Sequence, residues 1–316
     1  MMINWGILGL GGMGKIFANS IEKTSNSKLL GVASKSGNTF KNFKNQTYKD
    51  LIQNKNIHAL YISTLNNTHT ELIAEILKEN KKILCEKPVS TSLEDLLKIE
   101  KKIIEKKILF YEAIAYYSHQ QTLEILNLIN NDEIGEIQNI ESNFGYKAKF
   151  KSSSRIFNKS LGGGSIFDLG CYPLSFVMLF TKNPKNISIL SKEISYAKSG
   201  VDDDAKALLN CDNEFEGKIH VSIKNNLNNV CIIRGSKGSL KINEPWSPGT
   251  SSVIEVTNNK HFYVKSINSK LPVYVNQIEK VSESFLNQKN NSNLFDIQKS
   301  LINMKLINDW LENENI

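Results

Sequence analysis

The feature that most constrains the fold is a glycine-rich turn directly after the first apolar segment. Residues Ile3–Leu8 form a β-prone run, and this run is followed at once by Gly9-Leu10-Gly11-Gly12-Met13-Gly14. An amphipathic pattern from Met13 to about Lys23 predicts a helix next. Glycines at the G-x-G-x-x-G spacing permit a tight turn, a close backbone approach and close helix–strand packing. This order is typical of a turn that binds pyrophosphate at a helix N-terminus.

The same glycines also fit a second motif, the phosphate-binding loop of nucleoside triphosphatases. Its G-x-x-x-x-G-K spacing would run from Gly9 to Lys15. That loop requires Ser or Thr at the next position to hold Mg²⁺, and Ile16 stands there instead. The sequence therefore favours the dinucleotide turn.

Strands and helices alternate through the first third of the chain. Short apolar segments predict strands, and segments with a helical apolar period predict helices. The strands are expected at residues 3–8, 29–33, 59–63, 82–85 and 108–113, and the helices at 13–23, 70–79 and 93–107. Such alternation predicts a doubly wound parallel sheet with right-handed crossovers. Ligands bind such sheets at the carboxyl ends of the strands.

The second predicted strand ends in Ser34-Lys35-Ser36. A site for NAD usually has Asp or Glu about 20 residues after the glycine turn, where it accepts a hydrogen bond from the ribose 2′-hydroxyl. No acidic residue occurs between Gly31 and Lys49. Because hydroxyls and a lysine suit a 2′-phosphate, the sequence favours NADP, with NAD as the alternative.

Polar side chains also follow the third and fifth predicted strands. Ser63, Thr64 and Asn66 follow the third strand, and Asn66 is expected to meet a ribose or nicotinamide. His69 opens the next helix and is a further cofactor-side candidate, although a capping or surface role is the alternative. The fifth strand carries Glu112 near its end.

The fourth strand ends in the sequence Glu86-Lys87-Pro88. Proline lacks an N–H group and ends the strand, so Lys87 lies where the chain leaves the sheet. A lysine beside a carboxylate and above an apolar floor can donate to a reacting oxygen. The alternative is a solvated turn. The polar residues at the neighbouring strand ends favour the functional interpretation.

Beyond about Ser118 the pattern changes, which predicts two domains at residues 1–118 and 119–316. A helix is expected at 119–130 and a strand at 137–145. Segments that alternate as antiparallel strands follow between residues 187 and 265, with a hairpin turn at Asn258-Asn259. Two helices, near 275–287 and 296–311, close the chain. Whether these helices pack back on the first domain stays open.

A second glycine run, Gly162-Gly163-Gly164, opens an apolar segment that contains Asp168 and Tyr172. Glycines allow the backbone to come close to a ligand. On a helix, two residues four apart share a face, so the carboxylate and the phenol are expected side by side. The alternative is a hydrogen-bonded structural pair. Arg155 precedes this segment and is expected to contact cofactor or substrate, or to form a surface ion pair.

Composition excludes several other classes of function. The formal net charge is +7, but the lysines are scattered and the only arginines are Arg155 and Arg234, so a nucleic-acid partner is not expected. No apolar run approaches the roughly 20 residues that a membrane span requires. The four cysteines show no metal-ligand spacing, and with no signal peptide visible we expect reduced thiols in a cytoplasmic protein without a metal site.

Together these motifs resemble the glucose–fructose oxidoreductase, inositol dehydrogenase and MocA family over almost the whole chain. The resemblance rests on the glycine turn, Glu86-Lys87-Pro88, Glu112-Ala113 and the run from Gly162 through Asp168 to Tyr172. Tyrosine at 172, rather than histidine, is most similar to the branch that holds sugar dehydrogenases and dihydrodiol dehydrogenases. Leu65, Tyr117 and Gln120 depart from the residues usual in that family, which leaves the substrate open.

The resemblance implies an N-terminal Rossmann domain and a C-terminal α+β domain on an open, largely antiparallel sheet that commonly pairs subunits as dimers or tetramers. It implies hydride transfer between nicotinamide and a carbinol carbon of a sugar, cyclic polyol or related diol. Lys87, Asp168 and Tyr172 form the implied catalytic group, with Tyr172 exchanging the proton, Lys87 stabilising the alkoxide and Asp168 orienting the hydroxyl or Lys87. A non-catalytic NAD(P)- or sugar-binding regulatory protein of the same fold is the alternative.

The candidate cofactor-binding residues are Gly9, Leu10, Gly11, Gly12, Met13, Gly14, Ser34, Lys35, Ser63, Thr64, Asn66, His69, Glu86, Lys87, Glu112 and Arg155.

Overall fold

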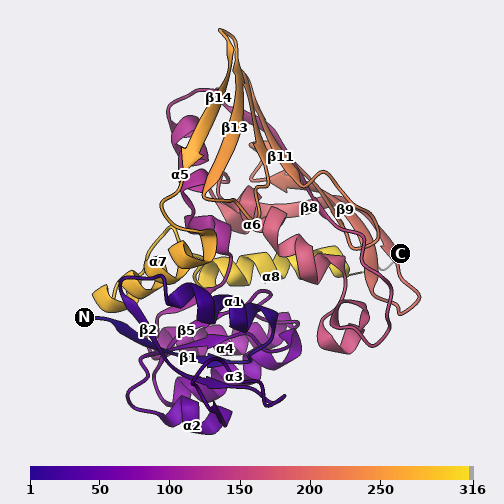
Figure 1. The fold of residues 1–316 in the computed structure, drawn as a ribbon. Helices are drawn as coiled ribbons and strands as arrows, with labels where there is room; N and C mark the ends of the chain where they lie inside the picture. Colours follow the sequence, from indigo (N-terminus) through magenta and orange to yellow (C-terminus); the bar gives the residue numbers. More distant parts are fainter. Residues whose placement is uncertain (313–316) are drawn as a thin grey trace. The chain divides into compact units, whose positions relative to one another are not determined.

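The computed structural model describes residues 1–312, which fall into two compact units (Figure 1). The first unit contains Met1–Ser118 and Leu271–Leu301, and the second contains His119–Lys270 and the described residues from Ile302 on. The segment from Leu271 to Leu301 thus returns to the first unit. That the first unit binds the cofactor and the second binds substrate and pairs subunits stays a prediction.

The first unit is built on a six-stranded, wholly parallel sheet in the order β3-β2-β1-β4-β5-β6. This order confirms the doubly wound sheet. The strands are β1 (Ile3–Leu8), β2 (Ser27–Ala33), β3 (Asn45–Gln46), β4 (Ala59–Ile62), β5 (Lys82–Cys85) and β6 (Phe110–Glu112). The strand β3 was not predicted, because two polar residues carry no alternating apolar pattern.

Helices cover this sheet, and two of them begin at a residue whose side chain caps the helix. Thr47 caps the unpredicted helix α2 and Ser92 caps α4, each through its side-chain oxygen. The helices of the first unit are α1 (Gly12–Ile21), α2 (Tyr48–Gln53), α3 (His69–Lys78), α4 (Leu93–Glu105) and α7 (Val273–Asn287). Helix α8 (Ile297–Leu311) begins in the first unit and ends in the second.

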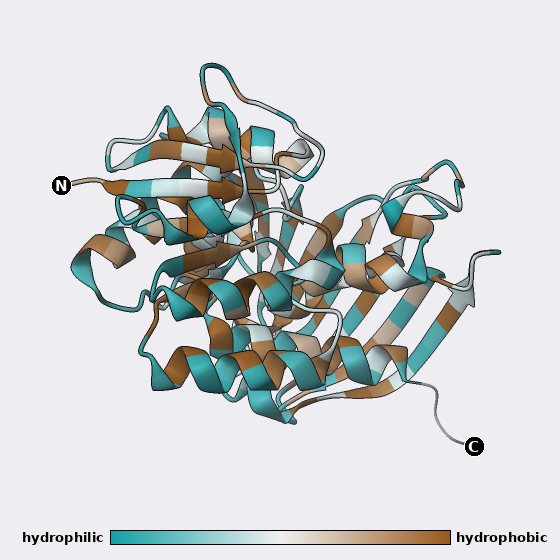
Figure 2. Cartoon of the chain, turned by 90° about the horizontal axis from the view of Figure 1, so that it is seen from below, coloured by the Kyte–Doolittle hydropathy of each residue, from teal (hydrophilic) through white to brown (hydrophobic). Residues whose placement is uncertain are grey.

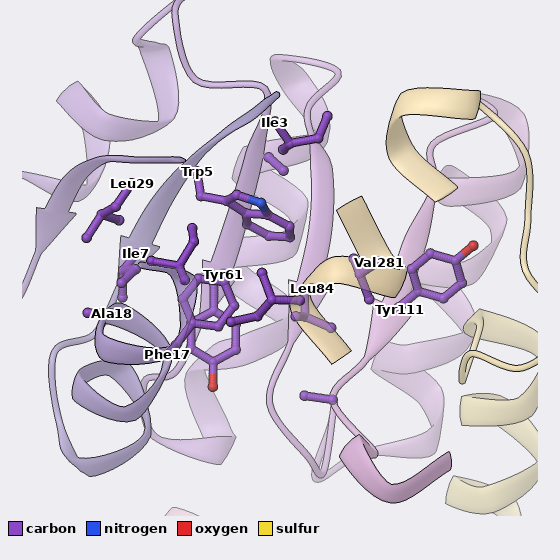
Figure 3. Packing of buried hydrophobic residues seen from close by; sticks show 14 of the residues in the cluster. Ile3, Trp5, Ile7, Phe17, Ala18, Leu29, Tyr61, Leu84, Tyr111 and Val281 are labelled. Carbon is purple, nitrogen blue, oxygen red and sulfur yellow. The ribbon is translucent and has the colours of Figure 1, made fainter. Parts of the chain in front are cut away.

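The core of the first unit joins α1 and α7 to the sheet (Figure 3). The Trp5 side chain of β1 is fully buried, and its Nε1 donates to Ser282 Oγ of α7 at 3.0 Å. The ring of Phe17 on α1 stacks on Tyr61 of β4 with 3.9 Å between centroids. Because α7 supplies part of this core, the first unit depends on residues far along the chain.

The second unit contains an eight-stranded sheet in the order β14-β13-β12-β11-β7-β10-β9-β8. Only β7 and β10 run parallel, which confirms a largely antiparallel sheet. The strands are β7 (Ile137–Gly145), β8 (Ile187–Tyr196), β9 (Asp202–Cys211), β10 (Phe215–Ser222), β11 (Val230–Gly235), β12 (Gly238–Asn243), β13 (Ser251–Asn258) and β14 (Phe262–Asn268). Asn258 closes the predicted hairpin between β13 and β14, its backbone N–H donating to the His261 carbonyl at 3.1 Å.

Helices α5 (Gln120–Asn130) and α6 (Cys171–Met178) pack on strands of this sheet. Near the end of α8 the buried Trp310 donates through Nε1 to the Lys206 carbonyl of β9 at 3.1 Å. Along β9 and β10 buried and more exposed residues alternate, and the strands accordingly change hydropathy from residue to residue (Figure 2). Within residues 1–312, no helix is long and apolar enough to cross a membrane.

Candidate functional site

The glycine turn after β1 is closely packed on one side and open on the other. Gly9 has a φ of +95°, and a Cβ there would lie 2.6 Å from the Ser63 carbonyl oxygen. A Cβ at Gly14 would lie 2.2 Å from the Gly9 carbonyl oxygen. At Gly11 and Gly12, by contrast, a Cβ would meet no atom within 4 Å. Packing within the chain therefore does not explain why these two positions lack side chains.

Helix α1 begins at Gly12, and no side chain caps its N-terminus. The first N–H groups of a helix attract anions, and side-chain-free positions at that end leave room for one. Leu10 is buried beneath the turn and Met13 is half-buried beside it. The turn therefore fits the pyrophosphate of a dinucleotide, and that the backbone from Gly11 to Met13 holds it stays a prediction.

The end of β2 presents one buried and two exposed side chains. Ser34 is buried, and its backbone N–H and carbonyl are both bonded to the Asn45 side-chain amide, at 2.7 and 3.0 Å. Its hydroxyl lies 2.9 Å from that of Ser36. Lys35 is exposed, with Nζ 5.9 Å from the centre of the Tyr48 ring. Asn45 therefore fixes the turn on which Lys35 extends into solvent.

The end of β4 supports the glycine turn from the other side. The Ser63 hydroxyl donates to the Gly9 carbonyl at 2.6 Å, and the Thr64 hydroxyl lies 2.7 Å from that of Thr68. Asn66 is buried in a short 3-10 turn. The His69 ring is fully buried, with Nδ1 2.9 Å from the Pro88 carbonyl oxygen and Nε2 3.3 Å from the Thr64 carbonyl oxygen. We interpret His69 as the link between two loops, and its contact with cofactor stays a prediction.

The Glu86-Lys87-Pro88 turn follows β5, with two carboxylates close to the lysine. Glu86 is buried and accepts a hydrogen bond from the Tyr61 hydroxyl. Burial, together with the Glu86 charge, raises the pKa of Tyr61, so this phenol stays protonated and remains a donor. Lys87 itself is half-buried. Burial and the Glu86 charge raise the pKa of Tyr274, and the Lys87 charge opposes that rise, so both charges act on Tyr274.

Glu112, at the end of β6, pairs with Cys85 in the sheet and is almost completely buried. Its Oε1 accepts a hydrogen bond from the Val89 backbone N–H at 2.9 Å. Burial raises the pKa of Glu112 to about 7, and the positive charge of Lys87 opposes that rise. Glu112 therefore anchors the turn after Lys87 and senses its charge, and its predicted contact with cofactor stays a prediction.

In the second unit, Arg155 and Tyr146 approach different oxygens of the Asp168 carboxylate. The Arg155 guanidinium donates to Oδ1 at 2.8 Å and the Tyr146 hydroxyl donates to Oδ2 at 2.9 Å. The Asp168 side chain is 8 % exposed, whereas that of Arg155 is 35 % exposed. The ion pair predicted as an alternative for Arg155 is thus formed, and its partner is a candidate catalytic residue. Tyr146 lies just beyond β7 and is exposed.

The segment that carries Asp168 and Tyr172 is not a regular helix throughout. Residues Ile166–Gly170 form a π-helical turn, and α6 begins at Cys171. Such turns are frequent at functional sites. The Tyr172 ring meets the Phe144 ring edge-on at 5.3 Å and lies 6.3 Å from the Trp246 ring, measured between centroids. Tyr172 is half-buried, and its ring packs beside two other aromatic rings.

The triple glycine brings the backbone close to other parts of the protein, and its expected approach to a ligand stays a prediction. A Cβ at Gly163 would lie 2.7 Å from the Arg155 carbonyl oxygen, and one at Gly164 would lie 2.1 Å from Asp202 Oδ1. Gly162 and Gly164 have φ values of +70° and +115°. The glycines thus close the loop that begins at Arg155.

The structure brings the predicted residues together in two groups. Glu86, Lys87 and Glu112 share one sheet edge of the first unit, and Arg155 and Asp168 are bonded in the second. That Lys87, Asp168 and Tyr172 act in one reaction stays a prediction. No motif in the sequence identifies the partners Tyr61, Asn45, Tyr146 and Asp202, because each contact joins residues distant along the chain.

The glycine turn and the strand order place the first unit in the class of dinucleotide-binding Rossmann folds. Residues 3–114 match the family model described as the oxidoreductase family with an NAD-binding Rossmann fold. Residues 122–241 match the GFO/IDH/MocA C-terminal domain. The chain therefore belongs to the GFO/IDH/MocA family of NAD(P)-binding oxidoreductases, as its motifs suggested.

Relatives of similar length include two trans-1,2-dihydrobenzene-1,2-diol dehydrogenases. The protein from Xenopus tropicalis is 25% identical over 82% of this chain and 81% of its own length. That from Mus musculus is 25% identical over 78% of this chain and 77% of its own.

Solved structures confirm the fold. A 3-ketoreductase from Actinomadura kijaniata, solved with NADP and TDP-benzene, has a TM-score of 0.88 at 19% identity over 98% of this chain and 96% of its own. An aldose–aldose oxidoreductase from Caulobacter crescentus, complexed with glycerol, has a TM-score of 0.87 at 17% identity with the same coverage.

Proposed function

We propose that this chain is an NAD(P)-dependent dehydrogenase or reductase that acts on a secondary hydroxyl or carbonyl carbon of a sugar, cyclic polyol or related diol. The observation that carries the proposal is the match to diol dehydrogenases over about four fifths of both chains. Two proteins of the same fold are named as a 3-ketoreductase and an aldose–aldose oxidoreductase, which is consistent with a carbonyl or hydroxyl carbon as the target. The intact Lys87, Asp168 and Tyr172 support turnover rather than binding alone.

When bound, the nicotinamide supplies or accepts the hydride, and the chain handles the proton. In oxidation the Tyr172 phenolate takes the hydroxyl proton as the hydride leaves the same carbon, and in reduction the phenol returns it. Lys87 stabilises the charge on the reacting oxygen. Asp168, held by hydrogen bonds from Arg155 and Tyr146, orients the substrate hydroxyl or Lys87.

For the cofactor, we propose NADP rather than NAD. The exposed Lys35 and the hydroxyls of Ser34 and Ser36 lie at the strand end where a ribose 2′-phosphate is bound in this class of fold. A charge-assisted contact of about 1.5–3 kcal/mol corresponds to roughly ten- to hundred-fold discrimination. Fluorescence titration is expected to show this preference for NADPH over NADH. Lys35→Ala should reduce it by weakening NADPH binding only, and equal dissociation constants in the unsubstituted protein contradict the proposal.

We also propose that two copies associate through the outer face of the eight-stranded sheet, in the cytoplasm. Cross-strand register places Glu255, Lys241, Ile232, Glu141 and Lys218 in one outward row of alternating charge. Such a row can pair with itself about a two-fold axis. The four buried free cysteines fit a reducing compartment. Light scattering tests the association, and a single-chain mass at micromolar concentration contradicts it.

The main experiment is a spectrophotometric screen of sugars, polyols and trans-diols with NADP and NAD, followed by Tyr172→Phe on the best substrate. Turnover of Tyr172→Phe is expected to fall by ~10²–10⁴, the usual worth of general acid–base catalysis. Its unfolding free energy should change by no more than ~1.5 kcal/mol, the typical net value of one hydrogen bond. A lower melting temperature with retained turnover would make Tyr172 structural. Nucleotide binding without turnover on any substrate would favour a regulatory protein.

A further inference from the structure

Three consecutive aspartates open β9, and each has a different partner. Asp203 accepts a hydrogen bond from the Ser195 hydroxyl, and Asp204 pairs with His220 at 3.0 Å. Asp202 instead contacts the start of the helical segment that carries Asp168 and Tyr172. The first acid of the three is therefore the one connected to the candidate catalytic residues.

Two hydrogen bonds hold the Asp202 carboxylate in a buried position. Its Oδ2 accepts from the Ser165 hydroxyl at 2.7 Å and from the Ile166 backbone N–H at 2.6 Å. Asp202 is 3% exposed and Ser165 is fully buried. A side chain at Gly164 would collide with the other carboxylate oxygen, Oδ1. Because Gly164 has no side chain, there is room for the Asp202 carboxylate beside it.

The position of this carboxylate suits the positive end of a helix. The first N–H groups of a helical segment have no partner within it, and a negative charge there is stabilised by the aligned peptide dipoles. Burial raises the pKa of Asp202, while the hydrogen bonds from Ser165 and Ile166 oppose that rise. The Asp202 carboxylate is thus hydrogen-bonded at the N-terminal end of this segment, where the backbone favours a negative charge.

The π-helical turn Ile166–Gly170 starts at this anchor. Wide turns of this kind are short and irregular, and they persist where the surrounding structure fixes them. At the far end, Asn303 Nδ2 donates to the Cys171 carbonyl at 3.2 Å, and Gly170 packs against the Trp310 ring. The turn is therefore held at both ends, and Asp202 is the charged member.

We propose that Asp202 is a positioning residue that fixes the π-helical turn and thereby places Asp168 and Tyr172 for the reaction. This inference rests on the proposed function for its catalytic consequence, but the anchoring itself does not. Neither residue of the Asp202–Ser165 pair is offered as a group that touches substrate or cofactor. Their effect reaches the reaction only through the backbone of the turn.

Asp202→Asn tests the proposal, with Asp203→Asn as a matched control one residue along the same strand. Hydrogen exchange measured by mass spectrometry on the peptide covering residues 163–172 is expected to speed up at least ten-fold in Asp202→Asn and to stay unchanged in Asp203→Asn. Turnover should fall at least ten-fold in Asp202→Asn alone, while the KM for the nucleotide stays within about two-fold, because the nucleotide turn lies in the first unit.

Two milder substitutions test the same contact in case Asp202→Asn does not fold. Ser165→Ala removes one of the two bonds to Asp202, and Ser195→Ala removes the corresponding bond to Asp203. Only Ser165→Ala should speed exchange over residues 163–172. Unchanged exchange in both Asp202→Asn and Ser165→Ala would overturn the anchor, and faster exchange with full turnover would overturn the positioning role. If the unsubstituted chain turns over no substrate, the proposed function fails, and the exchange data alone decide the anchor.

Discussion

The buried carboxyl group of Glu112 allows a quantitative test of the electrostatics beneath Lys87. Burial raises the pKa of Glu112 from 4.5 to about 7, and the Ser300 hydroxyl, the Val89 backbone N–H and the Lys87 charge each oppose the rise. Glu112→Gln keeps the shape of the side chain and an oxygen that can accept from Val89. It removes the titration, so the variant isolates the effect of the charge on folding.

The sign follows from the direction of the shift. Because the folded chain binds this proton more tightly than the unfolded chain, stability declines as the pH rises from about 4.5 and levels off above the folded pKa of about 7. A rise from 4.5 to about 7 corresponds to ~3 kcal/mol in total. Between pH 5 and pH 8 the same relation gives ~2.5 kcal/mol. Glu112→Gln does not lose stability in this way, so the difference in unfolding free energy between the variant and the unsubstituted protein should grow with pH.

Thermal unfolding of both proteins at several pH values measures this advantage. For a domain of roughly 150 residues, ~2.5 kcal/mol corresponds to roughly 5–10 °C. The difference in melting temperature between Glu112→Gln and the unsubstituted protein should therefore increase by that amount from pH 5 to pH 8. Glu105→Gln, at an exposed glutamate of α4, is the control and should show no such trend. Parallel melting curves for Glu112→Gln and the unsubstituted protein at all pH values would refute the assignment of a raised pKa.

Three further predictions concern the site. Lys87→Met should lower turnover by ~10² or more with nucleotide affinity near that of the unsubstituted protein, and turnover within a few-fold would make the strand end structural. Gly12→Ala should leave the melting temperature unchanged while weakening nucleotide binding at least ten-fold. Gly14→Ala should lower the melting temperature, because of these two positions only Gly14 has protein atoms where a Cβ would lie. If both variants changed binding and melting temperature equally, the open space at Gly12 would not be the nucleotide site. Asp168→Asn should lower turnover, and its combination with Tyr172→Phe should be non-additive, so strict additivity would argue against a shared site.

The strand pattern and the convergence of strand ends could be predicted because both follow from local periodicity and topology. β7 and β8 lie where their alternating residues predict them, at Ile137–Gly145 and Ile187–Tyr196. Once the sheet is parallel, the carboxyl ends of its strands lie at one edge. Gly9 and Glu112, which are more than a hundred residues apart, were therefore expected at one edge before any contact was known.

The partners of the functional side chains could not be predicted in the same way. Tyr61 donates to Glu86 across two neighbouring strands, and its position in β4 has the same apolar appearance as any core aromatic. Asp202 binds Ser165 from 37 residues away. The π-helical turn itself has no period that distinguishes it from an α-helix over five residues. Each of these features depends on tertiary packing, which the order of residues along the chain does not display.

One of the two carboxylates near Lys87, that of Glu112, allows a test of whether this sheet edge serves folding or the reaction. A buried glutamate with a raised pKa costs about 3 kcal/mol of stability at neutral pH, a large share of the 5–15 kcal/mol that typically holds a domain together. Neutral glutamine at position 112 would remove that cost, so a carboxylate there needs a reason outside folding. We expect Glu112→Gln to be more stable than the unsubstituted protein at pH 8 and yet to turn over substrate more slowly, because the charge interaction between Lys87 and residue 112 is lost. Melting temperature and turnover measured on the same preparation test both halves at once. A variant that is more stable and equally active would show that the Glu112 carboxylate is dispensable for the reaction.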